Sequence, residues 1–234
     1  MERISLVSIL LFGVVVFSVA FLFWRYVWFF RNPPRIVPAG TNIVSPADGT
    51  VVYVQDVEPG KPVIVVKQGM SATIRDIARE DIRSSKVLIG VFMSPLDVHY
   101  NRAPLGGVVE SIRNYPCDKE NLHMGIMHFR SLFGLKPYYT NSRHILENER
   151  TVTRIRGNHD AGEIGCYVVQ IAAKNVNCIE SYVPEGGQIT KGEIFGMIKI
   201  GSQVDTILPN IPGMQIKVRP GDKVRAGESI LVEW

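Results

Sequence analysis

The chain has 234 residues, of which 46% are hydrophobic, and its formal charge at pH 7 is +4. This length accommodates one large domain or two small ones, and the mild, dispersed charge suits an anionic membrane surface and argues against a nucleic-acid-binding protein. Cys117, Cys166 and Cys178 are odd in number and widely spaced. The sequence therefore indicates neither a disulfide framework nor a zinc site, and no metal is expected.

The first 30 residues are expected to form a membrane anchor. Ile4 to Trp24 is a run of 21 residues without a charge, and as a helix it would be roughly 30 Å long, the thickness of a bilayer core. Arg25, Arg31 and Arg35 follow the run, and fewer positive charges precede it. The positive-inside rule therefore places the rest of the chain on the cytoplasmic side of the cell (inner) membrane. A buried core helix is the alternative, and a signal peptide would have a shorter apolar run.

Aromatic residues around these arginines, from Trp24 to Phe30, are expected at the membrane interface. Residues 31–42 contain three prolines and are predicted to be a linker. Residues 43–234 are predicted to form one mainly β domain, a sandwich of short strands. Apolar runs bounded by Gly and Pro predict strands within 43–54, 63–66 and 86–93, and the spacing over 71–85 suits a short amphipathic helix.

Two stretches of the domain are weakly repeated. The segment 46–52 and the segment 104–109 share a proline, a glycine turn and a valine-rich strand, and 184–193 is echoed by 220–228. The second pair resembles the glycine-hinged hairpins of biotinyl- and lipoyl-type domains, in which glycines form the corners. Between the repeats, Tyr115 to Leu146 mixes apolar and basic residues. This segment is either an ordinary packed excursion or a mobile flap that touches anionic lipid.

The stretch from Phe195 to Asp205 carries the strongest indication of chemistry. Its apolar residues predict a buried strand, which Gly201 and Ser202 interrupt. Glycine permits backbone geometry that other residues resist, and the Ser202 hydroxyl can attack the carbonyl that precedes it. Such a reaction would cut the chain and leave Ser202 as a pyruvoyl group, a ketone able to accept electrons. A turn or bulge is the alternative, because the Gly-Ser pair is common.

Three further residues are candidates for acid–base chemistry. Asp48 precedes a glycine and a predicted strand, where a turn alone would account for it. Asp97 and His99 flank one residue at the end of a predicted strand, so alternation would place both side chains on one face. A carboxylate beside a histidine is suited to proton transfer near neutral pH, although a hydrogen-bonded core histidine is the alternative.

Four motifs, in this order, resemble those of phosphatidylserine decarboxylases of the short bacterial and archaeal type: Ser45-Pro-Ala-Asp-Gly49, Met93-Ser-Pro-Leu-Asp-Val-His-Tyr-Asn-Arg102, Asn148-Glu-Arg150 and Gly192-Glu-Ile-Phe-Gly-Met-Ile-Lys-Ile-Gly-Ser202. The resemblance covers about residues 30–234. It implies a proenzyme that cuts itself between Gly201 and Ser202 into fragments 1–201 and 202–234, which stay associated. In that family, residues matching Asp48, His99 and Ser202 are assigned to self-cleavage.

The resemblance also implies the reaction. A covalent pyruvoyl cofactor derived from Ser202 would form a Schiff base with phosphatidylserine, an anionic phospholipid, and release carbon dioxide to give phosphatidylethanolamine. His99 is implicated in this step, with Asp97 as its expected orienter. The resemblance leaves a homo-oligomer open. This chain departs from the longer branch of the family at Arg102, where that branch has a second histidine, and Gln203 replaces a usual arginine just after the cleavage serine. The segment 172–179 also lacks two expected arginines.

A non-catalytic alternative is a membrane-anchored carrier or adaptor domain of the biotinyl or lipoyl type. Met197-Ile198-Lys199 faintly resembles the hairpin on which biotin is attached, but here the lysine lies in an apolar run. An export adaptor would usually carry long coiled-coil heptads, which this chain lacks. Only the decarboxylase predicts spontaneous cleavage.

Overall fold

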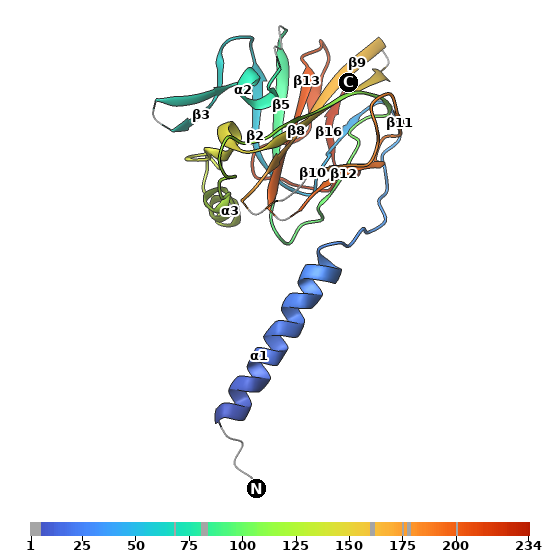
Figure 1. The fold of residues 1–234 in the computed structure, drawn as a ribbon. Helices are drawn as coiled ribbons and strands as arrows, with labels where there is room; N and C mark the ends of the chain where they lie inside the picture. The colour runs from blue at the N-terminus through green and yellow to red at the C-terminus, as the bar shows by residue number, and fades with distance from the viewer. Residues whose placement is uncertain are drawn as a thin grey trace.

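The computed structural model describes residues 6–67, 69–80, 84–159, 162–174, 176, 179–199 and 201–234. Figure 1 shows one long helix, α1 (Leu6–Phe23), projecting from one end of a β-rich domain. A π-helical turn, Trp24–Trp28, continues α1 toward that domain. The span Leu6–Trp28 is long and apolar enough to cross a membrane, and its most apolar stretch is not buried in the protein.

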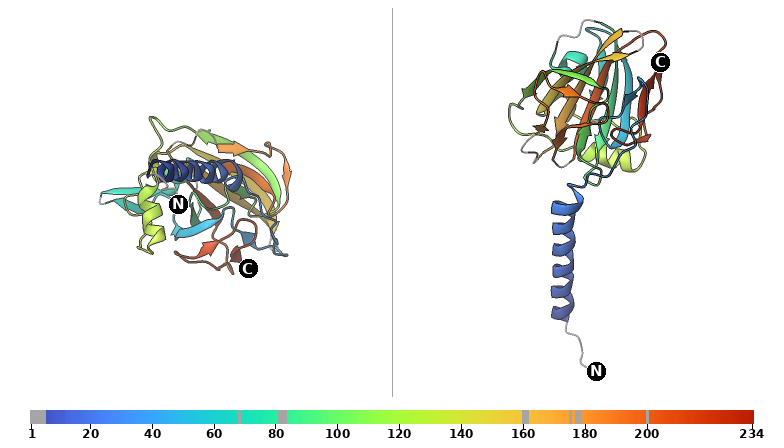
Figure 2. Two further views of the ribbon diagram at one scale, coloured as in Figure 1. Left: turned by 90° about the horizontal axis from the view of Figure 1, so that it is seen from below. Right: turned by 90° about the vertical axis from the view of Figure 1, so that its right-hand side faces the viewer.

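Most of the domain is one curled antiparallel sheet, which confirms the mainly β fold class (Figures 1 and 2). Its eight strands lie in the order β11-β7-β8-β9-β13-β5-β2-β15. In chain order they are β2 (Gly49–Val57), β5 (Lys86–Met93), β7 (Gly107–Tyr115), β8 (Arg150–His159), β9 (Gly162–Ala172), β11 (Gln188–Ile189), β13 (Ser202–Pro209) and β15 (Lys223–Val224). The predicted strands at 43–54, 63–66 and 86–93 are therefore present, the first of them divided by a turn at 45–48.

Three smaller sheets accompany the main one. Their strands are β1 (Ile43–Val44), β16 (Ile230–Glu233) and β14 (Gln215–Ile216) in one sheet, β10 (Ile179–Ser181), β12 (Ile194–Ile198) and β6 (Tyr100–Arg102) in the second, and β3 (Pro62–Lys67) with β4 (Met70–Thr73) in the third. Three short helices complete the described elements: α2 (Ile74–Ala78), α3 (Gly125–Leu132) and α4 (His144–Glu147).

The helix expected over 71–85 is shorter than predicted. Thr73 ends β4 and caps α2, because its side chain accepts a hydrogen bond from the Asp76 backbone while the Asp76 carboxylate accepts from the Thr73 backbone. Arg79 then takes a left-handed conformation, with φ of 55°, and ends the helix. Residues 81–83 lie outside the described residues.

The sheet consists of two similar halves, which confirms the weak sequence repeats. Ile189 of β11 lies opposite Gly107 of β7, and Val224 of β15 lies in the same way opposite Gly49 of β2. The small sheets β6-β12-β10 and β1-β16-β14 correspond as well. A Cβ atom on Gly49 would stand 2.1 Å from the Phe92 carbonyl oxygen, and one on Gly107 would stand 2.0 Å from its equivalent in Arg156. Close backbone approach therefore requires both glycines.

One half is inserted into the other, and this arrangement creates the site. Met93 ends β5 and Ser202 begins β13, and the two residues lie opposite each other as in a hairpin. The chain between them, residues 94–201, contains the whole second half. The insertion therefore leaves the sheet at the end of β5 and returns to it at the adjacent start of β13. His99 lies on the outgoing segment and Gly201 on the returning one.

Candidate functional site

Ser202 lies on an inner strand of the main sheet, at the end of that strand where the insertion returns. It is the first residue of β13, opposite Met93 on β5 and Ala172 on β9, and it is fully buried. Within the described part of the chain, its hydroxyl oxygen has one recorded partner, the Met93 sulfur at 3.4 Å. A thioether is a weak acceptor, so little holds this hydroxyl in place.

Gly201 precedes it in a conformation that favours glycine. Its φ is +53°, in the left-handed region. Its backbone N–H donates to the His99 Nε2 atom across 3.3 Å. The strand interruption predicted at Gly201 and Ser202 is therefore a left-handed residue followed by the start of a new strand. Ile200, which belonged to the same predicted run, lies outside the described residues.

His99 is buried and neutral at physiological pH. Its Nδ1 atom lies 2.9 Å from the Asp97 carbonyl oxygen, and because Nε2 accepts from Gly201, Nδ1 carries the proton. Burial lowers the pKa of His99 from 6.5 to about 4, against a smaller opposing effect of the Asp97 hydrogen bond and charge. An unprotonated Nε2 thus points at the Gly201 peptide.

Asp97 contacts His99 through its backbone. Residues 94–97 form a turn, since the Asp97 N–H donates to the Ser94 carbonyl at 3.0 Å. The Asp97 carboxylate accepts from the Ser94 N–H at 2.8 Å and so closes the same turn. The expected alternation of Asp97 and His99 on a strand face is not found, because β5 ends at Met93 and a turn follows. The carboxylate therefore acts on His99 by shaping the turn.

Asp48 lies near the site without touching its central residues. Its carboxylate accepts two hydrogen bonds from Arg35, at 2.9 and 2.8 Å, and a third from the Ala226 N–H at 2.7 Å. In the described residues these hydrogen bonds do not include His99 or Ser202. It precedes β2, the second strand from β13, so its backbone stands about 10 Å from Ser202 at ~4.8 Å per strand.

The turn itself does not require the Asp48 carboxylate. In the other half of the sheet, Gly106 occupies the position that Asp48 holds before β2. What the carboxylate does here is bind Arg35, whose side chain is only 5% exposed and also reaches Glu228 at 3.3 Å. Asp48 therefore holds the segment that follows α1 against the domain.

That segment covers His99, which the sequence did not indicate. Phe29 was expected at the membrane interface, but it is fully buried, and its ring centroid lies 4.2 Å from that of His99. Arg31 donates to the Leu96 carbonyl at 2.6 Å, in the turn before His99. Arg102, which stands where a second histidine is usual, donates to the Asn32 side chain at 2.6 Å. Arg31 and Arg102 therefore hold the linker against the site through these hydrogen bonds.

A buried polar network occupies the other face of β13. The Gln203 side chain donates to Asp205 at 2.7 Å and to the Tyr53 hydroxyl, and Tyr53 donates to Asp205 at 2.7 Å. His144 donates through Nε2 to the Gln203 oxygen at 3.1 Å. Burial raises the pKa of Asp205 to about 6 and lowers that of His144 to about 4. The Gln203 side chain thus links β13, directly after Ser202, to β2 and α4 without adding a buried charge.

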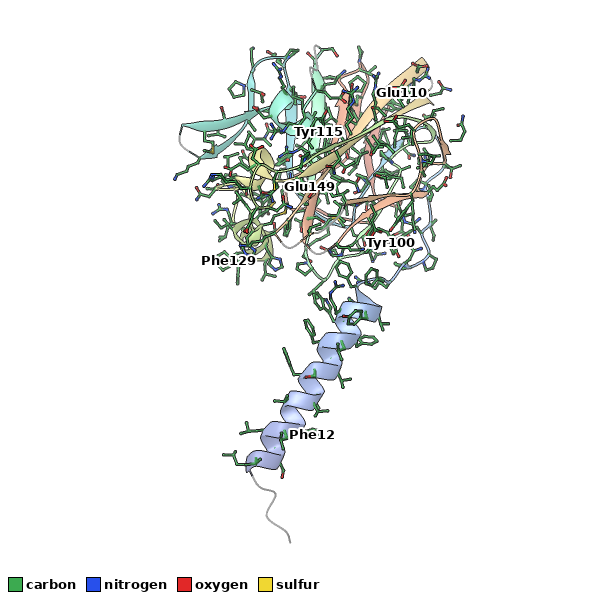
Figure 3. The ribbon with its side chains drawn as sticks, in the orientation of Figure 1. Phe12, Tyr100, Glu110, Tyr115, Phe129 and Glu149 are labelled. Carbon is green, nitrogen blue, oxygen red and sulfur yellow. The ribbon has the colours of Figure 1, made fainter. Side chains whose placement is uncertain are left out.

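The described part of the chain shows neither a candidate metal site nor a disulfide. No group of three or more His, Cys, Asp or Glu side chains there is placed to bind a metal. Cys117 and Cys166 are free thiols, and Cys178 lies outside the described residues. Figure 3 shows Tyr100, the residue after His99, at the end of the domain from which α1 projects. The site therefore lies toward the end of the domain from which α1 projects.

Known proteins match nearly the whole chain. Residues 22–232 match the family model described as phosphatidylserine decarboxylase. A protein provisionally named archaetidylserine decarboxylase proenzyme, from Methanocaldococcus jannaschii, is 35% identical over 88% of this chain and 87% of its own length. Phosphatidylserine decarboxylase proenzymes from Thermobifida fusca and Streptomyces coelicolor are 34% and 32% identical, over 87% and 86% of this chain and 71% and 69% of their own lengths.

Proposed function

Because the chain belongs to the phosphatidylserine decarboxylase family, we propose that it converts its own Ser202 to a pyruvoyl group and uses it to decarboxylate phosphatidylserine. The observation that carries this proposal is the Gly201–Ser202 junction. A left-handed glycine, a weakly held serine hydroxyl and an unprotonated imidazole nitrogen meet there in a buried site. None of the three is needed to build a strand.

Self-cleavage requires a base and a mobile nucleophile. His99 Nε2 takes the Ser202 hydroxyl proton, and the oxygen attacks the Gly201 carbonyl carbon. The Ser202 amine leaves with a proton, so an ester replaces the amide. Loss of the Ser202 Cα proton then expels the Gly201 carboxylate, and the remaining dehydroalanine reacts with water to give the ketone and ammonia. The low pKa of His99 keeps Nε2 available as a base at neutral pH.

The surroundings of residue 202 fit the resulting group. β13 is paired with β5 over eight residues and with β9 over six, so it would stay in the sheet after the cut and keep residue 202 in place. The two fragments would therefore remain associated. A ketone at this position would accept the electron pair that is released when the serine headgroup, bound through its amine, loses its carboxylate. His99, whose Nε2 atom accepts from the Gly201 N–H, is the group that we assign to return a proton to the substrate carbon.

The position of the site suits a lipid substrate in the membrane. The helix Leu6–Trp28 would span the bilayer, and the arginines that follow it favour a cytoplasmic location for the domain. Phe29 and Arg31 follow this helix by one and three residues, and their contacts with His99 and Leu96 would then keep the site close to the membrane surface. Membrane attachment should survive a high-salt wash, and deletion of residues 6–28 should release the protein while leaving Phe29 in place.

Denaturing mass spectrometry and carbon dioxide release test the proposal. Purified protein should separate into fragments 1–201 and 202–234, whereas Ser202→Ala should stay one chain and Ser181→Ala, a matched exposed serine on β10, should cleave normally. Cleaved protein should release carbon dioxide from phosphatidylserine, hydroxylamine should abolish this, and borohydride should couple lipid to the small fragment. A chain that remains uncut on long incubation would favour the carrier or adaptor class. Cleavage without carbon dioxide release would overturn the substrate alone.

A further inference from the structure

A cavity of about 270 Å³ opens beside Gly201. It is lined by Phe92, Pro95 and Gly201 together with the start of α3 and Lys174. The cavities of about 550 and 420 Å³ in the described structure are larger, but neither includes a residue from 92–99 or 201–202. A volume at the low end for ligand pockets fits a lipid headgroup and excludes its acyl chains.

The polar groups of this cavity are suited to an anion. Its polar side chains are His123, His128 and Lys174, and no carboxylate lines it. Both larger cavities, in contrast, include glutamates. Lys174 has an ion-pair partner, Glu120, at 3.4 Å, but that carboxylate is 81% exposed and is easily displaced. An anionic group entering the cavity would thus meet one ammonium and two imidazole donors.

The helix that borders the cavity adds to this preference. α3 begins at Gly125, beside the cavity, and no side chain caps its first turn. Backbone N–H groups at the start of a helix lack intrahelical partners and favour negative charge. They supplement the Lys174 ammonium and the two imidazole side chains.

The outer side of α3 is apolar and exposed. Ile126, Phe129, Leu132 and Phe133 are 52–69% exposed, whereas Met127 packs into the core. Figures 1 and 2 place α3 at the end of the domain from which α1 projects, and Figure 3 shows Phe129 at its outer edge. If α1 spans the bilayer, these side chains lie on the side of the domain that faces the membrane, next to the cavity. This favours the lipid-contacting interpretation of the segment 115–146.

We propose that this cavity binds the phosphodiester and serine carboxylate of the substrate headgroup, through Lys174, His128 and His123, while the exposed side of α3 contacts the acyl chains. The proposal rests on the proposed function and adds to it the residues that recognise the headgroup. Lys174 belongs to the segment 172–179, which lacks the two expected arginines, and it is the one ammonium among the residues that line the cavity.

Two measurements test the cavity. With fully cleaved enzyme and phosphatidylserine in mixed micelles, Lys174→Gln and His128→Gln should each raise KM about tenfold, since a hydrogen bond to a charged group contributes on the order of 1.5 kcal/mol. The control Lys217→Gln, an exposed lysine paired with Glu233, should leave KM unchanged. Phe129→Ser should weaken binding to phosphatidylserine vesicles without changing inhibition by soluble glycerophosphoserine.

Direct binding separates failure of the cavity from failure of the reaction. Glycerophosphoserine should bind the uncut Ser202→Ala protein, and adding Lys174→Gln should weaken that binding about tenfold. If turnover is normal but both Lys174→Gln and His128→Gln keep the wild-type KM and affinity, the headgroup lies elsewhere. If the wild type never turns over yet Ser202→Ala binds glycerophosphoserine in a Lys174-dependent way, the cavity assignment stands and the proposed reaction falls.

Discussion

Phe29→Ala should change the pH dependence of self-cleavage. The ring of Phe29 covers His99, with 4.2 Å between the ring centroids, and both side chains are fully buried. Burial is the main cause of the low pKa of His99. Removing the ring admits water to the imidazole and should raise that pKa toward its ordinary value of 6.5.

The size of the effect follows from the two pKa values. With a pKa of about 4, His99 is about 90% neutral at pH 5; with a pKa of about 6.5, it is about 3% neutral. If the neutral imidazole is the base, cleavage of the variant at pH 5 should be slower by up to about 30-fold. At pH 8 both forms are almost wholly neutral, so the base is equally available in the two proteins.

Cleavage is followed on denaturing gels after the newly made, detergent-solubilised protein is shifted to each pH. Phe29→Leu is the control, because it keeps His99 covered and should keep the acidic midpoint of the wild type. Truncation of a buried Phe costs about 3–5 kcal/mol of folding stability, so each rate is taken relative to the same variant at pH 8. Equal midpoints for Phe29→Ala and the wild type would refute the link between the covering ring and the base.

Three other changes test separate parts of the structure. Asp48→Ala and Arg35→Ala should slow cleavage to similar extents, and the double variant should be no slower than either, because both act through one ion pair; additive losses on the gel would give Asp48 a separate role. Gly90→Ala should destabilise the Ser202→Ala protein by about 1–3 kcal/mol in urea unfolding, because the new Cβ would lie 2.3 Å from the Tyr53 ring, whereas Gly165→Ala, with its nearest contact at 3.8 Å, should cost under about 1 kcal/mol. The free energy of unfolding should also fall by about 3 kcal/mol between pH 6.5 and pH 4. His99 and His144 bind protons more weakly in the folded protein, and each loses ~3 kcal/mol of stability over this range. The raised pKa of Asp205 acts in the opposite direction and offsets the loss from about one histidine. Urea midpoints that do not change over this range would contradict burial of these histidines in the neutral form.

Much of the fold is determined by local sequence patterns. Apolar runs between Gly and Pro locate β3 and β5, and the uncharged amino-terminal run locates α1, because side-chain periodicity and length depend only on near neighbours. The turns repeated at 46–52 and 104–109 are also visible as local patterns, although the reason for Gly49 and Gly107 is tertiary, since a side chain there would collide with the next strand. The serine hydroxyl beside its own carbonyl is likewise a local feature.

The surroundings of Ser202 depend on tertiary structure. His99 and Gly201 are 102 residues apart in sequence, and they meet because an entire half of the sheet is inserted between β5 and β13. Phe29 follows the apolar run in an aromatic cluster typical of a membrane interface, yet it packs on His99 because the Arg35–Asp48 ion pair holds its segment against the domain. The headgroup cavity combines residues from β5, the start of α3 and the chain after β9. Such contacts depend on strand order and register, which are decided by how the two halves pack, and no local pattern of side chains encodes that packing by itself.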